Sequence, residues 1–521
     1  MTDNHVESSF EDTLGLKGLR SLQIEQEDYS WNVLENPTEF YQTLRRLIKS
    51  SKNTVILSAL YLGNGKLERD LIQELDDALS DDKRPNLLIK LIFDHSRAHR
   101  GPNSSLELLT PLIQKHRERI QVFLYEMPQL REFPYNLMPG QLKEVAAVYH
   151  CKFGIFDENV IVTGSNLSEE YFVTRQDRYW LLEDKKKRPV EENSSILSFL
   201  RSFVDIIIRD CEMLNLDGKT LKPDISKQNS SAFLQRLISS SSSSSASTSL
   251  PTGINCVPLV QHRSLGIQLE ETVLLSLFNF FQTTAGRSSA SDKFAVHLST
   301  PYTNFSSQLS EKLVETCVAQ QTTVEIIGPD SSSHGFASAK GFKSLIPEFH
   351  LACFYSSMKA AYDKLPISSI SASGRTTRSY SFDHLTHQTF SRPGWTFHAK
   401  GLWFENEKQG EGGLPPLAGT YIGSSNFGER SWSRDFELGF LFYENNRNTH
   451  SPFREFLQKD LQVLKQHCHE HSDLQQKLAS FNPAPHYNFL KPTNIFDLRN
   501  LKETIKQNFV VFFAKLIKTY L

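Results

Sequence analysis

One short pattern of residues occurs twice in this 521-residue chain and constrains its fold more than any other feature. In each copy a lysine comes two residues after a histidine, and an acidic residue comes five residues after the lysine. No other histidine among the 17 has a lysine at that spacing. The repeat therefore predicts a fold of two similar halves. The two sets are His150, Lys152 and Asp157, and His398, Lys400 and Glu405.

Each copy is followed by a Gly-Ser turn that ends in an asparagine, and then by a second acidic residue. This acidic residue comes 11 positions after the asparagine in both copies, which supports a true internal repeat. We expect each acid to hydrogen-bond the far nitrogen of its own histidine and so to fix the tautomer of that ring. The residues are Ser165, Asn166 and Asp177 in the first copy, and Ser424, Asn426 and Glu437 in the second.

These residue types suit the transfer of a group through a phosphorus atom. Side chains alternate between faces of a strand, so the histidine and lysine of each copy are predicted to share one face. Two histidines suit a double displacement, in which one imidazole attacks phosphorus and the other protonates the leaving oxygen. The lysines and asparagines are expected to bind the non-bridging oxygens. No metal is required, because the lysines supply positive charge.

Length and composition divide the chain into segments. A chain of 521 residues is too long for one core and suits two domains. The unbroken serine run Ser239–Ser245 is typical of a flexible linker. We expect an N-terminal segment over 1–30 that is a targeting signal or disordered, a first domain over 31–230, a linker over 231–252, a second domain over 253–480, and a C-terminal extension with an apolar helix over 481–521.

Short apolar runs alternate with helix-compatible stretches in both halves. This alternation predicts an α/β/α sandwich with a mixed sheet in each half. Closing helices are predicted over 196–214 and 453–478. The expected strands are 54–58, 87–93, 120–124 and 160–162 in the first half, and 295–298, 324–327, 351–355 and 436–442 in the second.

The duplicated motif resembles the HxK(x)4D signature of the phospholipase D superfamily. The resemblance implies two α/β/α domains related by a pseudo-twofold axis, with the active site at their interface. It also implies a covalent phosphohistidine on the first-half histidine, here His150, with His398 as the acid–base partner. The second copy departs from the signature, because Glu405 replaces the family's aspartate and a Gly/Pro-rich insertion lies over 409–419.

Longer strings resemble the eukaryotic phosphatidylglycerophosphate synthases within that superfamily. The likeness spans most of the chain and implies transfer of a phosphatidyl group from CDP-diacylglycerol to sn-glycerol 3-phosphate, giving phosphatidylglycerophosphate and CMP. This is the committed step toward cardiolipin. The resemblance also implies a location on the matrix side of the mitochondrial inner membrane. The strings are LYLG at 60–63, TGSNLS at 163–168, YF at 171–172, RQDRY at 175–179, GF at 335–336 with KG at 340–341, and RPGWTFH at 392–398.

An acceptor with its own phosphate needs further cations, for which arginine provides bidentate contacts. Three histidines near 467–471 could suggest a metal site, but solvated or packing histidines are favoured there. The candidates for the acceptor phosphate are Arg175, Arg178, Lys340 and Arg392.

The segment 58–66 has a faint likeness to a phosphate-binding loop. In the family that the chain resembles, this region is sometimes marked as a possible ATP site. It lacks the first glycine spacing and the hydroxyl residue after the lysine that such a loop needs. A strand end followed by a turn is the favoured interpretation, and no cofactor is expected. The residues of this nucleotide hypothesis are Ser58, Gly63 and Gly65.

Other functions remain as alternatives. Cardiolipin synthase and phosphatidylserine synthase chemistry would differ only in the acceptor. A nucleic-acid phosphodiesterase would need a basic, aromatic-lined groove, and the net charge of −2 argues against nucleic acid as a partner. A catalytically inactive scaffold is disfavoured by the intact first motif.

The resemblance implies peripheral contact with a membrane surface. It contains no run of about 18 apolar residues, so a spanning helix is not expected. The apolar run Phe509–Ala514 suits either a membrane surface or docking on the protein's own core. No clear transit peptide is present, because four acidic residues precede Lys17. The oligomeric state is not predicted.

Overall fold

The computed structural model describes residues 10–470, apart from several internal stretches. The predicted C-terminal helix, most of the Ser-rich linker and most of the second-copy insertion lie outside the described residues. The internal stretches that are not described are 25–27, 139, 186–194, 224–229, 240–252, 286–292, 319–321, 341–343, 345, 367–368, 371–375, 378–383, 407–416 and 446–450.

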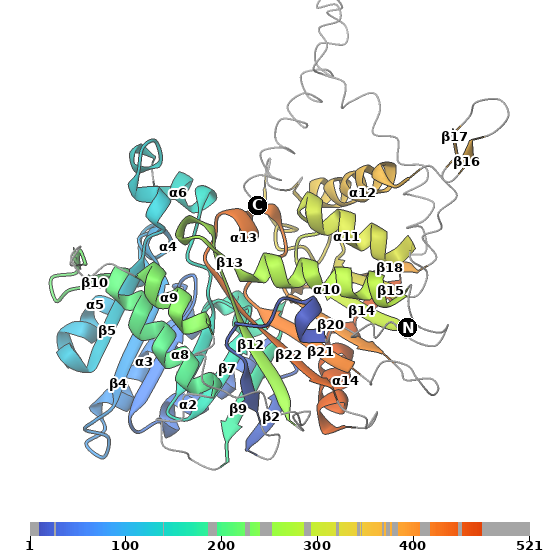
Figure 1. Cartoon of the computed structure of the whole chain (residues 1–521). Coiled ribbons are helices and arrows are strands. Elements are labelled where there is room, and N and C mark those ends of the chain that lie inside the picture. Colours follow the sequence, from blue (N-terminus) through green and yellow to red (C-terminus); the bar gives the residue numbers. More distant parts are fainter. Residues whose placement is uncertain are drawn as a thin grey trace, which may run out of the picture.

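The first half is built on one mixed sheet, which lies on the left of Figure 1. At one edge of this sheet the short strand β11 (Thr220–Leu221) pairs with β10. From that edge the order is β10 (Glu212–Leu214), β5 (Ile120–Tyr125), β4 (Leu88–Asp94), β3 (Thr54–Ser58), β6 (Phe153–Phe156), β7 (Asn159–Thr163), β9 (Tyr179–Asp184) and β2 (Tyr29–Val33).

The second half repeats this sheet strand for strand. The short strands β1 (Leu22–Ile24) and β13 (Ile267–Gln268) both pair with β12 at its edge. The order that matches the first half is β23 (Cys468–Glu470), β18 (Leu385–Phe390), β15 (Thr322–Pro329), β14 (Phe294–Ser299), β20 (Gly401–Asn406), β21 (Leu417–Gly423), β22 (Glu437–Asn445) and β12 (Ile254–His262).

Strand directions match as well as strand order. In each sheet three neighbouring strands run parallel, β3–β4–β5 and β14–β15–β18, and the remaining pairs in the matched order are antiparallel. This agreement confirms the predicted two-domain α/β fold with an internal repeat. The carboxyl ends of parallel strands in such sheets are where ligands usually bind.

Helices cover the outer face of each sheet, and a shared core joins the two halves. One apolar cluster lies between the helices and sheet of each half, and a third contains residues of both halves. In the third cluster the Trp180 ring lies 5.2 Å from that of Phe442. The covering helices are α2 (Pro37–Ser50), α3 (Lys66–Ser80) and α5 (Ser105–His116) in the first half, and α10 (Leu269–Ala285), α11 (Ser307–Val318) and α12 (Ile346–Lys364) in the second.

Capping residues fix where the main helices begin. The Asn36 side chain accepts a hydrogen bond from the Glu39 amide, and Pro37 takes the first helical position of α2. Ser451 and Pro452 do the same for α14 (Pro452–Lys465) in the second half. A capping side chain satisfies a free amide at the helix start, and proline suits the first turn because its missing N–H is not needed there.

Most predicted strands are present, but three segment predictions were wrong in part. Residues 351–355 lie within α12, because a five-residue apolar run cannot distinguish a strand from a buried helix. The predicted helix over 196–214 ends at Ile207, as α8 (Ile196–Ile207), and its last residues form β10. The helix predicted from 453 ends at Lys465, and β23 follows it.

The chain's first described residues belong to the second half. The helix α1 (Phe10–Thr13) and β1 pack there, and the Phe10 ring lies 5.1 Å from that of Phe280. These residues differ from the expectation of a targeting or disordered segment over 1–30. The helix α9 (Ser230–Ile238) occupies the first residues of the range predicted as a linker.

Candidate active site

Two short segments cross between the halves and bring the duplicated motifs together. The strand β8 (Arg175–Gln176) of the first half pairs with β19 (Thr396–Phe397) of the second. The amide of His398 donates to the Gln176 carbonyl at 2.7 Å. In the mirrored contact, the amide of His150 donates to the Phe436 carbonyl at 2.9 Å. Each histidine is therefore held by the residue that precedes the second acid of the other half.

This arrangement exchanges the acids between the halves. His150 Nδ1 lies 2.8 Å from Glu437 Oε2, and His398 Nδ1 lies 2.7 Å from Asp177 Oδ2. The prediction that each acid orients the histidine of its own half was wrong, although the acids themselves are those predicted. Because Nδ1 faces a carboxylate in both cases, Nε2 is the nitrogen available for chemistry.

The lysines fold back onto their own histidines. Lys152 Nζ donates to the His150 carbonyl at 2.7 Å, and Lys400 Nζ donates to the His398 carbonyl at 2.6 Å. Both motifs lie just before a strand rather than in one, since β6 and β20 begin one residue after the lysine. The predicted strand placement was therefore wrong by a few residues, yet the two pairs still converge at one site.

Burial dominates the electrostatics of the site. It lowers the pKa of both histidines, that of Lys152 to about 7 and that of Lys400 to about 8. Burial also raises the pKa of Glu437 to about 7. Buried cations of this kind are costly without a counter-charge, so an anionic ligand between the lysines would restore their charged form.

The pKa of Asp177 is shifted in the opposite direction from that of Glu437. Burial opposes ionisation of Asp177, but Lys400 and the hydrogen bond from His398 outweigh it and hold the pKa of Asp177 below its usual value. Gly164 is required beside this pair, because an added Cβ would lie 2.8 Å from Asp177 Oδ1 and 3.1 Å from the Lys400 Cδ. The two acids therefore differ in pKa despite the shared architecture of the half-sites.

Of the serines and asparagines in the two Gly-Ser turns, Ser424 contacts the acid that holds His150. Asn166 Oδ1 accepts a 3.3 Å hydrogen bond from the Leu60 amide. Asn426 Oδ1 is buried and has no hydrogen-bond partner within the described ranges. Ser424 Oγ donates to Glu437, and the Ser165 amide donates to Thr163. A buried amide oxygen without a partner is uncommon and points to a ligand or water at this place.

Tyr171 is a site residue that sequence reasoning missed. Its hydroxyl lies 3.1 Å from His398 Nε2, and its ring stands edge-on to the imidazole at 4.9 Å. Five residues after the second asparagine the chain has Ser431 instead, whose hydroxyl accepts a bond from the Asn426 amide. The quoted YF string at 171–172 contained this tyrosine, but only the crossing of the halves places it on His398.

The third residue of each signature lies away from the histidines. Asp157 caps a turn, accepting amide hydrogen bonds of 2.7–2.9 Å from Lys52, Asn53 and Thr54. Glu405 is partly exposed, and its carboxylate lies 3.9 Å from the Arg454 guanidinium. Each stands five residues along a strand from its lysine, or about 16 Å. The placement of both residues among the catalytic groups was therefore wrong.

Of the four residues predicted to bind the acceptor's phosphate, Arg175 alone contacts Tyr171, the hydrogen-bond partner of His398. Its guanidinium lies 4.7 Å from the Tyr171 ring centre and donates to Thr396 at 3.0 Å. Arg392 stacks on Trp395, and Lys340 is exposed. Arg178 is buried and bonds Asp460, so its predicted contact with the acceptor was wrong.

Replacing Arg178 with alanine is expected to destabilise the protein by about 3–5 kcal/mol, because it leaves the Asp460 carboxylate buried without its cation. The guanidinium also bonds the Tyr421 carbonyl at 2.7 Å and lies over Trp403. Thermal or urea unfolding measures the effect, with the exposed Arg46→Ala as the control. A normally stable Arg178→Ala protein with weakened acceptor binding would contradict this structural role.

The segment of the nucleotide hypothesis forms a strand end and a helix start. Ser58 Oγ lies 2.7 Å from the Tyr149 hydroxyl, inside the protein. An added Cβ on Gly63 or Gly65 would meet the Glu68 carboxylate, and Gly65 precedes α3. The segment therefore follows the end of a strand, as predicted, and a carboxylate lies beside both glycines.

Comparisons with known proteins agree with the fold. A solved phosphatidylserine synthase from Haemophilus influenzae shares the fold, with a TM-score of 0.66 over 97% of this chain and 98% of that one at 19% identity. The mitochondrial CDP-diacylglycerol–glycerol-3-phosphate 3-phosphatidyltransferase of Gallus gallus is 30% identical over 463 residues, covering 80% of this chain and 74% of the relative.

A fungal relative extends the match. The enzyme of the same name from Saccharomyces cerevisiae is 27% identical over 455 residues, covering 83% of this chain and 82% of its own length. No family model matches the chain. The extent of these alignments, with the repeated sheet and the paired histidines, places the chain in the CDP-diacylglycerol–glycerol-3-phosphate 3-phosphatidyltransferase family.

Proposed function

We propose that the chain works by two displacements at one phosphorus atom, with a covalent intermediate on His150. The overall reaction is that of its family: the phosphatidyl group of CDP-diacylglycerol passes to sn-glycerol 3-phosphate, giving phosphatidylglycerophosphate and CMP. The observation that carries the mechanism is the pair of buried histidines, each oriented through Nδ1 by an acid of the opposite half.

The contacts of the two histidines favour His150 as the nucleophile. His398 Nε2 accepts a hydrogen bond from Tyr171, whose burial raises the pKa of its phenol and keeps it a neutral donor. Within the described residues, His150 Nε2 has no such bond. In the first step His150 Nε2 attacks phosphorus, the bond to CMP breaks, and His398 gives its proton to the CMP oxygen.

The second step reverses the roles at His398. Its neutral imidazole takes the proton of the acceptor hydroxyl, the acceptor oxygen attacks phosphorus, and the bond to His150 Nε2 breaks. Lys152 and Lys400 supply positive charge to the non-bridging oxygens in both steps, so we propose that no metal or nucleotide cofactor takes part. The anionic donor itself favours the charged forms of these lysines and of His398.

The relatives' names place the enzyme in mitochondria, and we propose that it acts at the matrix side of the inner membrane. No helix within the described parts of the chain is long and apolar enough to cross a bilayer. The donor is a lipid, so we propose peripheral contact with the membrane surface, where the donor's head group is accessible.

The acceptor decides between this function and its nearest alternatives. Purified protein in mixed micelles with labelled CDP-diacylglycerol is expected to form product with sn-glycerol 3-phosphate. No product is expected with serine or with phosphatidylglycerol. A product with serine would indicate a phosphatidylserine synthase, and a product with phosphatidylglycerol would indicate a cardiolipin synthase. Mass spectrometry of the lipid product identifies the acceptor. A product with serine but not with glycerol 3-phosphate would overturn the proposed function.

A further inference from the structure

The chain between β5 and β6 forms a loop over 128–146, which includes the helix α6 (Gly140–Ala146) and carries exposed apolar side chains. Among the described residues eight large apolar side chains are exposed, and four of them lie in this 128–146 loop. Phe133 and Leu137 are 79% and 75% exposed, and none of the other six exceeds 50%. Single exposed apolar residues are ordinary, but a group of them marks an interaction surface. The four residues are Phe133, Tyr135, Leu137 and Val145.

The internal repeat does not account for this loop. Strand β5 matches β18 in the order of the two sheets. In the first half β5 ends at Tyr125 and His150 follows 25 residues later. In the second half β18 ends at Phe390 and His398 follows after only 8 residues. A much shorter segment therefore suffices to join this strand to a catalytic histidine, and the additional length in the first half has another cause.

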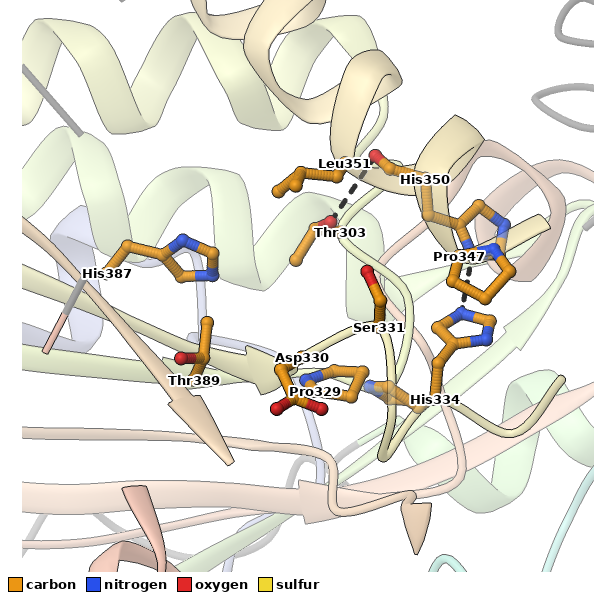
Figure 2. A pocket seen from close by; sticks show the side chains of 11 residues that line it. Thr303, Pro329, Asp330, Ser331, His334, Pro347, His350, Leu351, His387 and Thr389 are labelled. Atoms are coloured by element: carbon orange, nitrogen blue, oxygen red, sulfur yellow. Dashed lines mark hydrogen bonds between the residues drawn. The ribbon is translucent and has the colours of Figure 1, made fainter. Parts of the chain in front are cut away.

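The second half has a different surface at the matching place. A polar cavity of about 130 Å³ lies there, at the carboxyl ends of β14, β15 and β18 (Figure 2). Its wall includes His334 and His350, whose Nε2 and Nδ1 atoms lie 2.8 Å apart. None of the eight exposed large apolar side chains of the described chain belongs to this half. The exposed apolar group is therefore confined to the half that contains His150.

The base of the 128–146 loop is fixed beside the active site. Gln129 Nε2 donates to the Arg434 carbonyl of the second half at 2.9 Å. Two residues further along, the Phe436 carbonyl accepts the hydrogen bond from the His150 amide. The loop ends at the buried Ala146, four residues before His150. Figure 1 shows α6 at the upper end of the first half, beyond the strands of its sheet. The loop thus joins an exposed apolar surface to a fixed base next to the proposed nucleophile.

Cations lie in and beside the loop, and the acids that pair with them are more deeply buried. The side chains of Glu126 and Glu144 are each 11% exposed, whereas Arg100 is 45% and Arg131 33% exposed. Glu132 is an exposed acid in the described part of the loop. Exposed cations next to apolar side chains suit a surface of anionic lipid head groups. The ion pairs are those of Arg131 and Lys143 with Glu126, and of Arg97 and Arg100 with Glu144.

We propose that the 128–146 loop docks on the surface of a bilayer that contains anionic phospholipid, with Phe133 and Leu137 inserted below the head groups. The proposal rests on the proposed function, since the donor CDP-diacylglycerol is itself a lipid of such a bilayer. The reacting phosphorus of the donor lies at the level of the head groups, where His150 must reach it. Tyr135 suits the same level, because its ring combines an apolar body with a polar end. Docking through this loop places the segment that leads to His150 at the bilayer surface.

Flotation with vesicles of equal parts phosphatidylcholine and phosphatidylglycerol tests the proposal. We expect the full chain with both Phe133→Ser and Leu137→Ser to bind about 10-fold more weakly or worse, because two large apolar side chains lose their burial in lipid. Leu216→Ser is the matched control and is expected to bind as the wild type does. Leu216 is 42% exposed in the turn between β10 and β11, at the opposite end of the same sheet.

Turnover separates docking from a loss of structure. A short-chain CDP-diacylglycerol that is dissolved as monomers needs no bilayer, so the double variant is expected to use it at the wild-type rate. Its rate with donor in vesicles is expected to fall in step with its binding. Leu137→Trp is expected to strengthen vesicle binding, because tryptophan favours the membrane interface. An equal loss of both rates in a folded double variant overturns the proposal, and if that variant fails to fold, Leu137→Trp decides the matter.

Other occupants of the surface give distinct results. Unchanged vesicle binding by the double variant overturns the proposal. A wild-type dimer in sedimentation that the same two changes dissociate would assign the surface to a second copy of the chain, and it overturns the proposal too. Flotation needs no turnover, so failure of the wild type to use glycerol 3-phosphate would overturn the proposed function while flotation still tests the loop.

Discussion

Replacing His150 with alanine is expected to abolish transfer and to prevent any label from CDP-diacylglycerol remaining on the protein. Loss of the nucleophile in a comparable double-displacement enzyme costs about 10⁶ in kcat. Within the described residues His150 Nε2 has no hydrogen bond while Nδ1 lies 2.8 Å from Glu437, and this Nε2 is the atom that we propose attacks phosphorus. Acid-quenched mixtures with donor labelled in the phosphatidyl group measure the adduct, and peptide mapping locates it.

His398→Ala is the matched variant and is expected to behave differently. Turnover falls by about 10²–10⁴, the usual contribution of general acid–base catalysis. The adduct on His150 still forms, although more slowly, because CMP leaves as a phosphate and depends less on the proton from His398 than the acceptor hydroxyl depends on its base. The adduct therefore accumulates. Equal labelling of wild type and His150→Ala would show that the nucleophile is assigned to the wrong histidine.

The parts of the site that the sequence predicted are those set by local spacing. His150, Lys152, His398 and Lys400 were identified from a two-residue interval, and Asp177 and Glu437 from a shared offset. The strand 54–58 was predicted because its three central residues are apolar and two of them are β-branched. Patterns of this kind depend only on residues close together in the chain.

The parts that could not be predicted depend on contacts across the two halves. Asp177 and Glu437 serve the opposite histidines because β8 pairs with β19 and Tyr149 bridges Phe436, which no local pattern encodes. Tyr171 reaches His398 over 227 residues of sequence for the same reason. Arg178 was misassigned because an arginine that binds phosphate and one that neutralises a buried aspartate look alike in sequence.

Asp157 shows a different limit of prediction from sequence. One residue of a motif can serve the fold of the chain and not the reaction. Its carboxylate accepts three backbone amides at the end of β6, where it holds the turn that begins β3. The residue also has a φ of 51°, in the left-handed region that aspartate tolerates better than most residues. Its place in the signature is thus explained by backbone geometry.

Exchanging the two second acids for amides is expected to separate the two steps of the reaction. Glu437→Gln weakens the orientation of His150 and slows formation of the adduct, by up to about 10⁴ from the effect of the same change in a histidine–aspartate pair. Asp177→Asn acts on His398, so the adduct forms but passes slowly to glycerol 3-phosphate. Rapid-quench measurements of label on the protein and in the lipid product resolve the two rates.

The crossed geometry fixes which variant affects which step. If each acid served the histidine of its own half, Asp177→Asn would slow adduct formation and Glu437→Gln would slow its transfer, the reverse of the pattern expected here. Asp157→Asn is the control for loss of a carboxylate in the motif, since its side chain bonds only backbone amides in the described structure and is expected to lower stability while both rates persist. The separation of rates by acid therefore reports directly on how the two halves are joined, because the contacts of β8 with β19 and of Tyr149 with Phe436 carry each acid to the other half's histidine.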